Sequence, residues 1–536
     1  MSSFVRITYA FIFIFGIFGG ASVIASEDGI DAAFKKLIQR DFSQKEQAIQ
    51  QILKSGDVRS NIYLKALLDG KLYYRKVDKR IVNVDKKESG YQIFDVRNGE
   101  DLGVISKRKV KKITINNKLR GKIKSAMASL ALNDPDAELR LAAVKQMLGT
   151  NDVNLLASLK VLLEKETDDE VKEAINEAMA FSELSSSDPK KQLEALVVLG
   201  SSLNSEVRAE IVSLSKSSSD PKIKKAALKA VKSIESKISF YTNLETLFFG
   251  LSLGSILALA AIGLAITFGV MGVINMAHGE LIMIGAYTTY VVQLLMPNYI
   301  GASILVSIPA AFIVSAIVGI AIERGVIRFL YGRPLETLLA TFGISLILQQ
   351  TVRSIFSPLN RSVETPSWMS GSLEFNSLLS ITYNRLYIFV FCLIVFWLLY
   401  LVMKKTSLGL NVRAVSQNRA MARAMGVRTE WVDAMTFGLG SGIAGVAGVA
   451  LSQITNVGPN LGQAYIVDSF MVVVFGGVGN LWGTLISGLS LGVVSKFLEP
   501  ETGAVLAKIL VLVFIILFIQ KRPKGLFPQK GRAAEG

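Results

Sequence analysis

The second half of this chain is dominated by long apolar runs that begin near Leu244. A helix needs about twenty mostly apolar residues to cross the hydrocarbon core of a bilayer. Length and hydropathy predict about nine such segments, at 246–268, 281–296, 302–323, 335–356, 386–403, 431–453, 464–478, 481–498 and 504–520. Residues 26–239 contain no run of that length. We therefore expect an all-α, polytopic membrane domain over residues 244–522, preceded by a domain that lies outside the bilayer.

Charge is distributed along the membrane half as in a multi-pass protein. The formal net charge of +16 is by itself compatible with nucleic-acid binding. The Lys and Arg residues, however, gather in three stretches, around Arg324 to Arg333, at Lys404 to Arg428 and at Lys521 to Arg532. Loops rich in Lys and Arg stay in the cytoplasm, so all three stretches are expected there. No nucleic-acid-binding module accompanies the charge, and we expect no nucleic-acid partner.

The N-terminus has the pattern of a secretory signal peptide. Arg6 precedes an apolar core, and small residues precede a possible cleavage site after Ala25. The alternative is an uncleaved anchor helix, because the apolar core is long for a signal peptide. Under both interpretations the domain after Ala25 is exported. Residues 1–25 are thus predicted as the signal segment, 26–240 as an exported domain and 523–536 as a cytoplasmic tail.

The exported domain is predicted to combine a β-rich insert with helical repeats. Over residues 71–112, apolar and polar residues alternate around a Glu-Ser-Gly turn, which predicts strands. Over residues 125–238, similar segments open with Asp or Asn as a helix N-cap and continue with apolar residues at helical spacing. One such unit cannot bury its apolar face alone, so we expect HEAT-like paired helices that stack on one another. An ordinary helical bundle is the alternative.

One apolar run, Ala258 to Tyr290, is interrupted by three polar residues, Asn275, His278 and Glu280. A bilayer interior does not accept such groups unless they line a path or find partners, so they are candidates for a substrate path. The alternative is a short turn between two spans that faces water. His278 and Glu280 do not face each other on a helix. We therefore assign His278 to orientation or hydrogen bonding rather than to proton transfer.

A second apolar run, Val474 to Gly488, is broken by glycines and carries Asn480 and Thr484. Short or Gly-broken segments in the two halves of a transporter point to its binding site. The alternatives are tight helix packing and a simple turn between spans. The small residues from Gly438 to Gly448 are predicted to serve close packing rather than chemistry.

The longest basic stretch contains a short Ala-rich helix former, Gln417 to Met425, which ends at Gly426. A compact helix outside the bilayer is typical of a docking element. The alternative is a positively charged topology anchor that contacts only lipid headgroups.

Three separated motifs resemble the permease of the branched-chain amino acid type of ABC importers. They are GLSLGSILALAAIGLAITFGVMGVINMAHGELIMIGAY, SLGLNVRAVSQNRAMARAMGV and FGGVGNLWGTLISG. The resemblance covers essentially residues 244–530. Within that family the chain is most similar to the urea-type permease, because of GGVGNLWGT, the tail KRPKGLFPQKGR and the exported N-terminal extension.

The resemblance implies an ATP-driven importer in a bacterial inner membrane, with a periplasmic N-terminal domain. Its partners would be a second permease subunit, two cytoplasmic ATPase subunits and a periplasmic solute-binding protein. The chain has no GxxxxGK[ST] motif, so ATP would be used by the partner subunits, and we expect neither enzyme activity nor a cofactor. The coupling helix that docks on an ATPase would comprise Arg419, Ala420, Met421, Arg423, Ala424 and Gly426. Ala420 stands where this family's motif usually has Glu, and Met421 stands where it has Ala.

A urea permease needs a narrow path whose polar groups replace the hydrogen bonds of water to a small neutral solute. The predicted path residues are Asn275, His278, Glu280, Asn480 and Thr484. The alternatives are a branched-chain amino acid permease of the same family, a passive channel without an ATPase, and a membrane-anchored scaffold. About nine spans exceed what an anchor needs. One His and one Cys, Cys392, exclude a disulfide within the chain and a structural zinc site built on several Cys and His.

Overall fold

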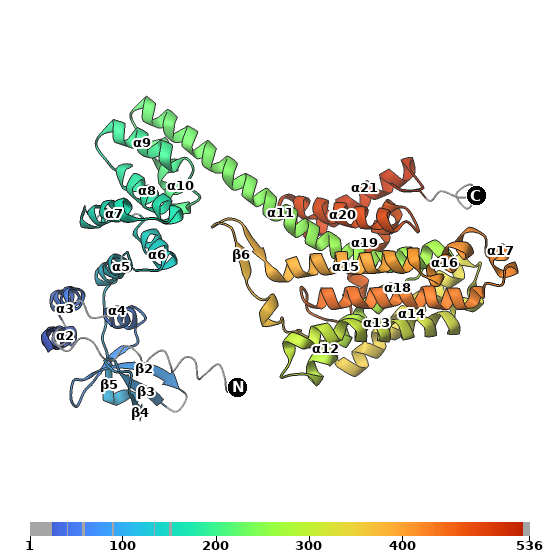
Figure 1. Ribbon diagram of the computed structural model, residues 1–536, viewed down its shortest axis with the longest axis horizontal. Helices are drawn as coiled ribbons and strands as arrows, with labels where there is room; N and C mark the ends of the chain where they lie inside the picture. Colours follow the sequence, from blue (N-terminus) through green and yellow to red (C-terminus); the bar gives the residue numbers. More distant parts are fainter. Residues whose placement is uncertain are drawn as a thin grey trace. The chain divides into compact units, whose positions relative to one another are not determined.

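The chain folds into two compact units, Met1–Glu235 and Ser236–Gly536 (Figure 1). The computed structural model describes residues 24–39, 41–55, 59–87, 90–132, 134–148 and 153–528. The predicted signal peptide lies almost wholly outside these residues, as does the end of the predicted tail.

The first unit opens with three helices and a small sheet. The helices are α2 (Ile24–Leu37), α3 (Phe42–Lys54) and α4 (Ser60–Leu68). Phe34 of α2 and Tyr63 of α4 meet edge to face, with ring centroids 5.3 Å apart, and both rings are buried. This aromatic pair joins the first and third helices in one apolar core.

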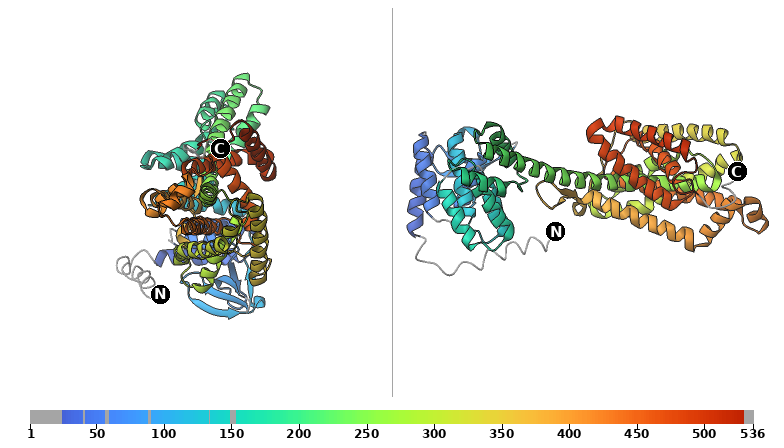
Figure 2. Two further views of the ribbon diagram at one scale, coloured as in Figure 1. Left: turned by 90° about the vertical axis from the view of Figure 1, so that its right-hand side faces the viewer. Right: turned by 90° about the horizontal axis from the view of Figure 1, so that it is seen from above.

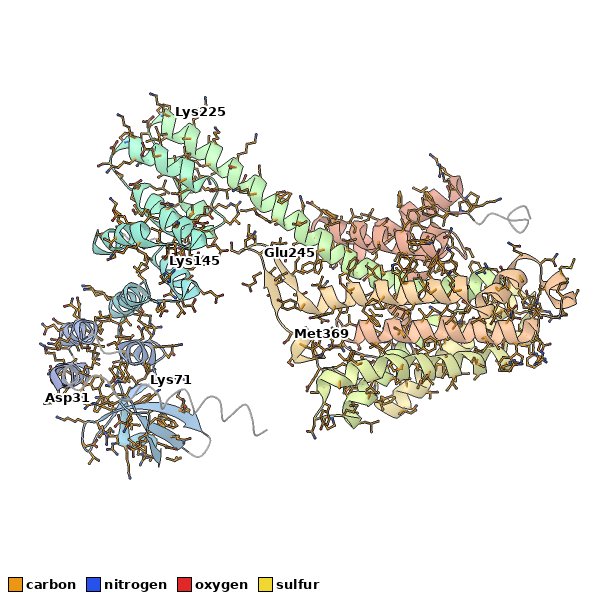
Figure 3. The ribbon with its side chains drawn as sticks, viewed as in Figure 1. Asp31, Lys71, Lys145, Lys225, Glu245 and Met369 are labelled. Carbon is orange, nitrogen blue, oxygen red and sulfur yellow. The ribbon has the colours of Figure 1, made fainter. Side chains whose placement is uncertain are left out.

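The predicted β-rich insert over residues 71–112 is confirmed as a five-stranded antiparallel sheet. Its strands are β1 (Leu72–Arg75), β2 (Ile81–Lys87), β3 (Gly90–Asp95), β4 (Asp101–Ile105) and β5 (Val110–Lys112), with the 3-10 turn η1 (Lys107–Lys109) before β5. The order across the sheet is β4-β3-β2-β1-β5. Val82 and Val84 of β2 are buried on one face together with Ile93 of β3, which explains the alternation in the sequence. Lys71, which precedes β1, pairs with Asp85 of β2 at 3.6 Å and is labelled in Figure 3.

Short capped helices follow the sheet: α5 (Asn117–Ala131), α6 (Ala137–Met147), α7 (Val153–Lys165), α8 (Asp169–Glu183), α9 (Pro189–Leu199) and α10 (Ser205–Ser217). The predicted Asp and Asn N-caps are confirmed, because Asp136, Asp168, Asp188 and Asn204 each accept a bond from a backbone N–H in the first turn. The HEAT-like stacking of these helices stays a prediction.

Helix α11 (Pro221–Met271) has 51 residues and belongs to the first unit at its start and to the second at its end. The other helices of the second unit are α12 (His278–Leu295), α13 (Ile300–Gly325), α14 (Pro334–Phe356), α15 (Tyr383–Lys405), α16 (Ser407–Gln417), α17 (Arg419–Ala424), α18 (Thr429–Ser452), α19 (Leu461–Gly476), α20 (Leu481–Thr502) and α21 (Ala504–Lys521). The long helices run lengthwise beside one another in Figure 2. Between α13 and α14 lies η2 (Ile327–Leu330), and between α14 and α15 lie η3 (Ser367–Met369) and the hairpin β6 (Ser372–Glu374) and β7 (Ser380–Thr382).

All nine predicted membrane segments are helical, and seven of the described helices are long and apolar enough to cross a bilayer. The other two are α12 and α19. Helix α19 has 16 residues, or about 24 Å of rise, against about 30 Å of hydrocarbon. Helix α12 opens with His278 and Glu280, which shortens its apolar part.

Helix α18 and the apolar end of α11 form the buried centre of the second unit, whereas only a minority of the residues in the apolar windows of α13, α14, α15 and α21 are buried. The small residues of α18 allow close contact, as predicted. A side chain at Gly440 would collide with the backbone of Gly263 on α11, and one at Gly448 would collide with the backbone of α12.

Candidate functional site

The chain between α11 and α12 leaves the helical conformation inside the second unit. Gly272 has a positive φ of 65°, and helix α12 begins only at His278. Asn275 is 1% exposed, and its Oδ1 accepts a bond from the Ala277 backbone N–H at 3.0 Å. Its Nδ2 has no hydrogen-bond partner among the described residues. This break therefore places an unpaired amide donor in the interior of the protein.

Helix α14 holds the break in place. The backbone N–H of Met276 donates to Thr341 Oγ1 at 3.1 Å. One turn further along α14, Ser345 Oγ donates to Glu280 Oε1 at 3.0 Å. Glu280 is 1% exposed, and its Oε2 has no partner among the described residues. Glu280 is thus a buried carboxylate with one oxygen paired and the other available.

The start of α12 lies level with the middle of α14 and α18, and with the first turn of α19. Ser345, which bonds Glu280, is the central residue of α14. The ring of His278 packs on Gly263 of α11, which in turn touches Gly440 at the middle of α18. The first break is therefore an interruption at mid-span, and a turn in water, the alternative considered from the sequence, does not describe it.

His278 fixes the position of this helix end. Its Nε2 lies 2.8 Å from the carbonyl oxygen of Ala260, and the side chain is fully buried. A carbonyl only accepts, so Nε2 carries the hydrogen and Nδ1 is left as an acceptor. These contacts agree with the predicted role of His278 in orientation or hydrogen bonding.

Sequence reasoning missed a polar face on α14. Four polar residues recur there at intervals of four, and all are buried: Thr337, Thr341, Ser345 and Gln349. Residues four apart lie on one face of a helix, so this spacing was the available signal. Thr341 and Ser345 contact the break, and Gln349 donates to Asn460 just before α19 at 3.2 Å. We call Asn275, His278, Glu280 and this α14 face the mid-span cluster.

The second predicted break is a turn at the end of two helices. Gly477 and Gly479 both have positive φ, and Asn480 caps α20 by accepting from the Gly483 N–H at 3.1 Å. The Asn480 amide also donates to the Phe527 carbonyl, and Thr484 Oγ1 donates to the Asn480 carbonyl. The described structure therefore gives Asn480 and Thr484 partners of their own, outside the mid-span cluster. Their part in a path stays a prediction.

The C-terminal segment covers this turn. The backbone N–H groups of Leu526 and Phe527 donate to the carbonyls of Phe475 and Gly476, the last residues of α19, at 2.9 and 3.1 Å. These bonds satisfy carbonyls that a helix end otherwise leaves free. The turn, the end of α19 and the tail thus form one structural unit.

The basic stretch from Lys404 to Arg428 contains two helices, and the second covers the predicted docking element. Helix α16 occupies residues 407–417, and α17 comprises six residues, Arg419–Ala424, with Asn418 as its N-cap. Arg419 makes a two-pronged ion pair with Asp433 of α18. Met421 and Met425 are 59% and 78% exposed. The segment is therefore anchored to α18 and exposes two methionine side chains.

Comparison with known families gives a match over residues 246–519 to the permease component of the branched-chain amino acid transport system. The chain is 31% identical to the high-affinity branched-chain amino acid permease BraD of Pseudomonas aeruginosa, over 53% of this chain and 96% of that protein. It is 33% identical to LivH of Salmonella typhimurium and 32% identical to LivH of Escherichia coli K12, each over 54% of this chain and 96% of the relative. No solved structure matches the chain. Its membrane half makes the chain a member of the branched-chain amino acid permease family.

Proposed function

We propose that this chain is a permease subunit of an ATP-driven importer and that its solute is a branched-chain amino acid. The observation that carries the proposal is the mid-span cluster, where Glu280 and Asn275 keep unpaired polar atoms at an interrupted helix. Polar groups inside a membrane domain mark solute paths, and interrupted helices are typical places for them. The relatives named as branched-chain amino acid permeases support this solute.

The cluster has the chemistry that a zwitterion with an aliphatic side chain requires. The free oxygen of Glu280 accepts an ammonium group, and the N-terminal end of α12, with its positive dipole, attracts a carboxylate. Leu281 and Ile282 of α12 belong to the apolar core beside them. Both charged ends and the side chain of leucine, isoleucine or valine thus have matching groups.

Urea is the second candidate. Among the described residues, the cluster atoms that lack a partner are one donor, Asn275 Nδ2, and two acceptors, His278 Nδ1 and Glu280 Oε2. A small amide that donates through N–H groups and accepts through its carbonyl matches this set. The motifs that resemble the urea-type permease also favour this solute.

Energy would reach the path through partner subunits. The exposed Met421 of α17 and Met425 just after it suit an apolar groove of an ATPase, and the Arg419–Asp433 pair ties that segment to the buried α18. We propose a complex with a second permease, two ATPase subunits and a solute-binding protein. The solute-binding protein and the N-terminal unit would lie on the same outer side of a bacterial inner membrane.

The proposed orientation of the membrane half depends on whether the two short helices, α12 and α19, cross the bilayer. If α12 and α19 both return the chain across the bilayer, the segments at 326–333, 406–428 and 522–528 share one side. If neither does, the first two move to the opposite side from the tail. All three are basic, so the positive-inside rule favours the first arrangement.

Uptake in cells that lack or carry this chain tests the proposal and separates its alternatives. We expect chain-dependent uptake of labelled leucine that stops after ATP depletion and is reduced by excess valine but not by urea. Chain-dependent uptake of labelled urea that ignores leucine would instead establish the urea permease. Flux that persists after ATP depletion would identify a passive channel and contradict both importers.

A further inference from the structure

A separate cavity of about 200 Å³ lies among the helices α11, α19, α20 and α21. Its size suits a ligand smaller than a drug-like molecule. None of its lining residues belongs to the mid-span cluster. Its walls are apolar on one side, with Leu257, Val472, Leu491 and Val511 all buried.

Two ion pairs lie on the other side of this cavity. Lys508 Nζ of α21 is 2.9 Å from Asp468 Oδ2 of α19, and Lys496 Nζ of α20 is 2.5 Å from Glu499 Oε2. Asp468 lies in the interior of α19 and faces α21. Charged side chains within membrane helices are costly and are retained where they serve a function.

Charged side chains of both ion pairs remain accessible to a ligand. The Lys508 side chain is 58% exposed and that of Glu499 is 38% exposed, whereas Asp468 is 13% exposed. Lys508 Nζ also lies 6.0 Å from the ring centroid of Tyr465, which adds a cation–π contact. The cavity thus offers two cations, two anions and an apolar wall, with no net charge.

We propose that this cavity binds a small zwitterion: an ammonium group and an acidic oxygen group joined to an aliphatic chain. The ammonium group pairs with the Asp468 and Glu499 carboxylates, the acidic oxygens pair with Lys508 and Lys496, and the aliphatic chain contacts the apolar wall. Two sources have this chemistry, a free aliphatic amino acid and an ethanolamine phospholipid. The apolar face that α21 exposes offers a path for the acyl chains of a lipid.

Binding to the delipidated, full-length protein tests the site. Labelled leucine is measured by equilibrium dialysis, and phosphatidylethanolamine is measured by native mass spectrometry against phosphatidylglycerol, which lacks an ammonium group. We expect saturable binding of one zwitterion that Asp468→Asn and Lys508→Gln each weaken by about tenfold. Lys508→Arg, which keeps the charge, should retain most of the affinity even if Lys508→Gln lowers the melting temperature.

The matched control is Glu336→Gln, which removes a carboxylate from an exposed ion pair with Arg333 at 3.1 Å, outside the cavity. It should bind like the wild type. Leucine binding that depends on Asp468 identifies an amino-acid site, and phosphatidylethanolamine binding that depends on Asp468 identifies a lipid site. The proposal is overturned if neither zwitterion binds, or if binding is the same in Asp468→Asn and Lys508→Gln as in the wild type.

Discussion

Asn275 and Asn480 each interrupt an apolar run of the sequence, yet their surroundings in the structure differ. Asn275 is buried in the mid-span cluster with a free amide donor. Asn480 uses its carbonyl oxygen to cap α20 and its amide to bond the Phe527 carbonyl. The amide of Asn275 is unpaired among the described residues, whereas both polar atoms of Asn480 have partners.

Alanine substitution should separate these two roles. We expect Asn275→Ala to reduce leucine uptake by about threefold to tenfold at unchanged expression, because one hydrogen bond to the solute is lost. Asn480→Ala removes a helix cap and should lower the free energy of unfolding by about 1 kcal/mol, and its uptake per folded molecule tests the predicted part of Asn480 in the path. Uptake and thermal unfolding are measured on both variants. Full uptake by Asn275→Ala would show that Asn275 is not a path residue.

A buried ion pair in the first unit makes its stability depend on pH. Arg140 donates to both oxygens of Glu166 at 2.7 Å, and the Glu166 side chain is 1% exposed. These bonds, together with those from the Asp168 and Thr167 N–H groups, lower the pKa of Glu166 to about 2. A lowered carboxyl pKa stabilises the folded state above the unfolded value of about 4.5, and this contribution is lost as the pH falls toward 2.

Glu166→Gln should therefore matter most at neutral pH. We expect about 1.5–3 kcal/mol less protection against hydrogen exchange in α6 and α8 at pH 7, and a difference from the wild type that shrinks below pH 4. Comparing variant and wild type at each pH cancels the intrinsic exchange rate. The control is Glu235→Gln in the exposed pair with Arg208, which should change little. A difference that is constant between pH 7 and pH 3 would contradict the assignment.

At the scale of elements, hydropathy and helix-cap residues were the sequence features that best predicted where the helices lie. Apolar length located the nine helices that correspond to the predicted membrane segments, because a helix in a bilayer must pair its backbone groups within itself. The Asp and Asn caps located α6, α8, α9 and α10 of the first unit for a similarly local reason. The mid-span cluster was only partly predictable. Asn275 and Glu280 are conspicuous in an apolar run, but the bonds from the Met276 backbone to Thr341 and from Ser345 to Glu280 depend on packing between helices.

Packing also explains why the two Gly-rich breaks looked equivalent in the sequence. Both carry glycines with positive φ, and both end at the start of a helix. Only the break before α12 is level with the middle of α14 and α18. The break before α20 is instead hydrogen-bonded to tail residues about fifty positions away in sequence. No local pattern distinguishes the two.

We expect helix α17 to couple the ATPase cycle of the partner subunits to solute uptake. We expect Met421→Lys to reduce ATP-dependent uptake by about tenfold, because a charge replaces an apolar contact in the proposed groove. Membrane insertion should be unchanged, since Met421 is exposed. The control is Phe375→Lys, an exposed apolar residue in the hairpin between β6 and β7, on the proposed outer side. Normal uptake by Met421→Lys would rule out docking at this helix.

At the scale of the whole molecule, the proposed orientation places the first unit outside and α17 inside. The single cysteine, Cys392, is buried, so Cys392→Ser gives a background for labelling. In that background we expect Val77→Cys and Phe375→Cys to react with an impermeant maleimide on intact spheroplasts. Met425→Cys should react only after permeabilisation, because its loop is basic. All three parent residues are exposed.

Labelling of Met425→Cys in intact spheroplasts would reverse the orientation of the loop that contains α17. The Cys392→Ser background alone should remain unlabelled on both sides. This control shows that any signal comes from the introduced residue.

Glu280 offers the most direct test of the central claim, that solute passes the mid-span cluster. Glu280→Gln keeps an oxygen for the Ser345 hydroxyl but removes the negative charge. Labelled leucine is followed into proteoliposomes that hold the whole importer with ATP supplied to the ATPase side, with the exposed Glu364→Gln as control. We predict ATP-dependent accumulation by the wild type and the control, and about tenfold less by Glu280→Gln. Equal accumulation by Glu280→Gln and the wild type would contradict the account.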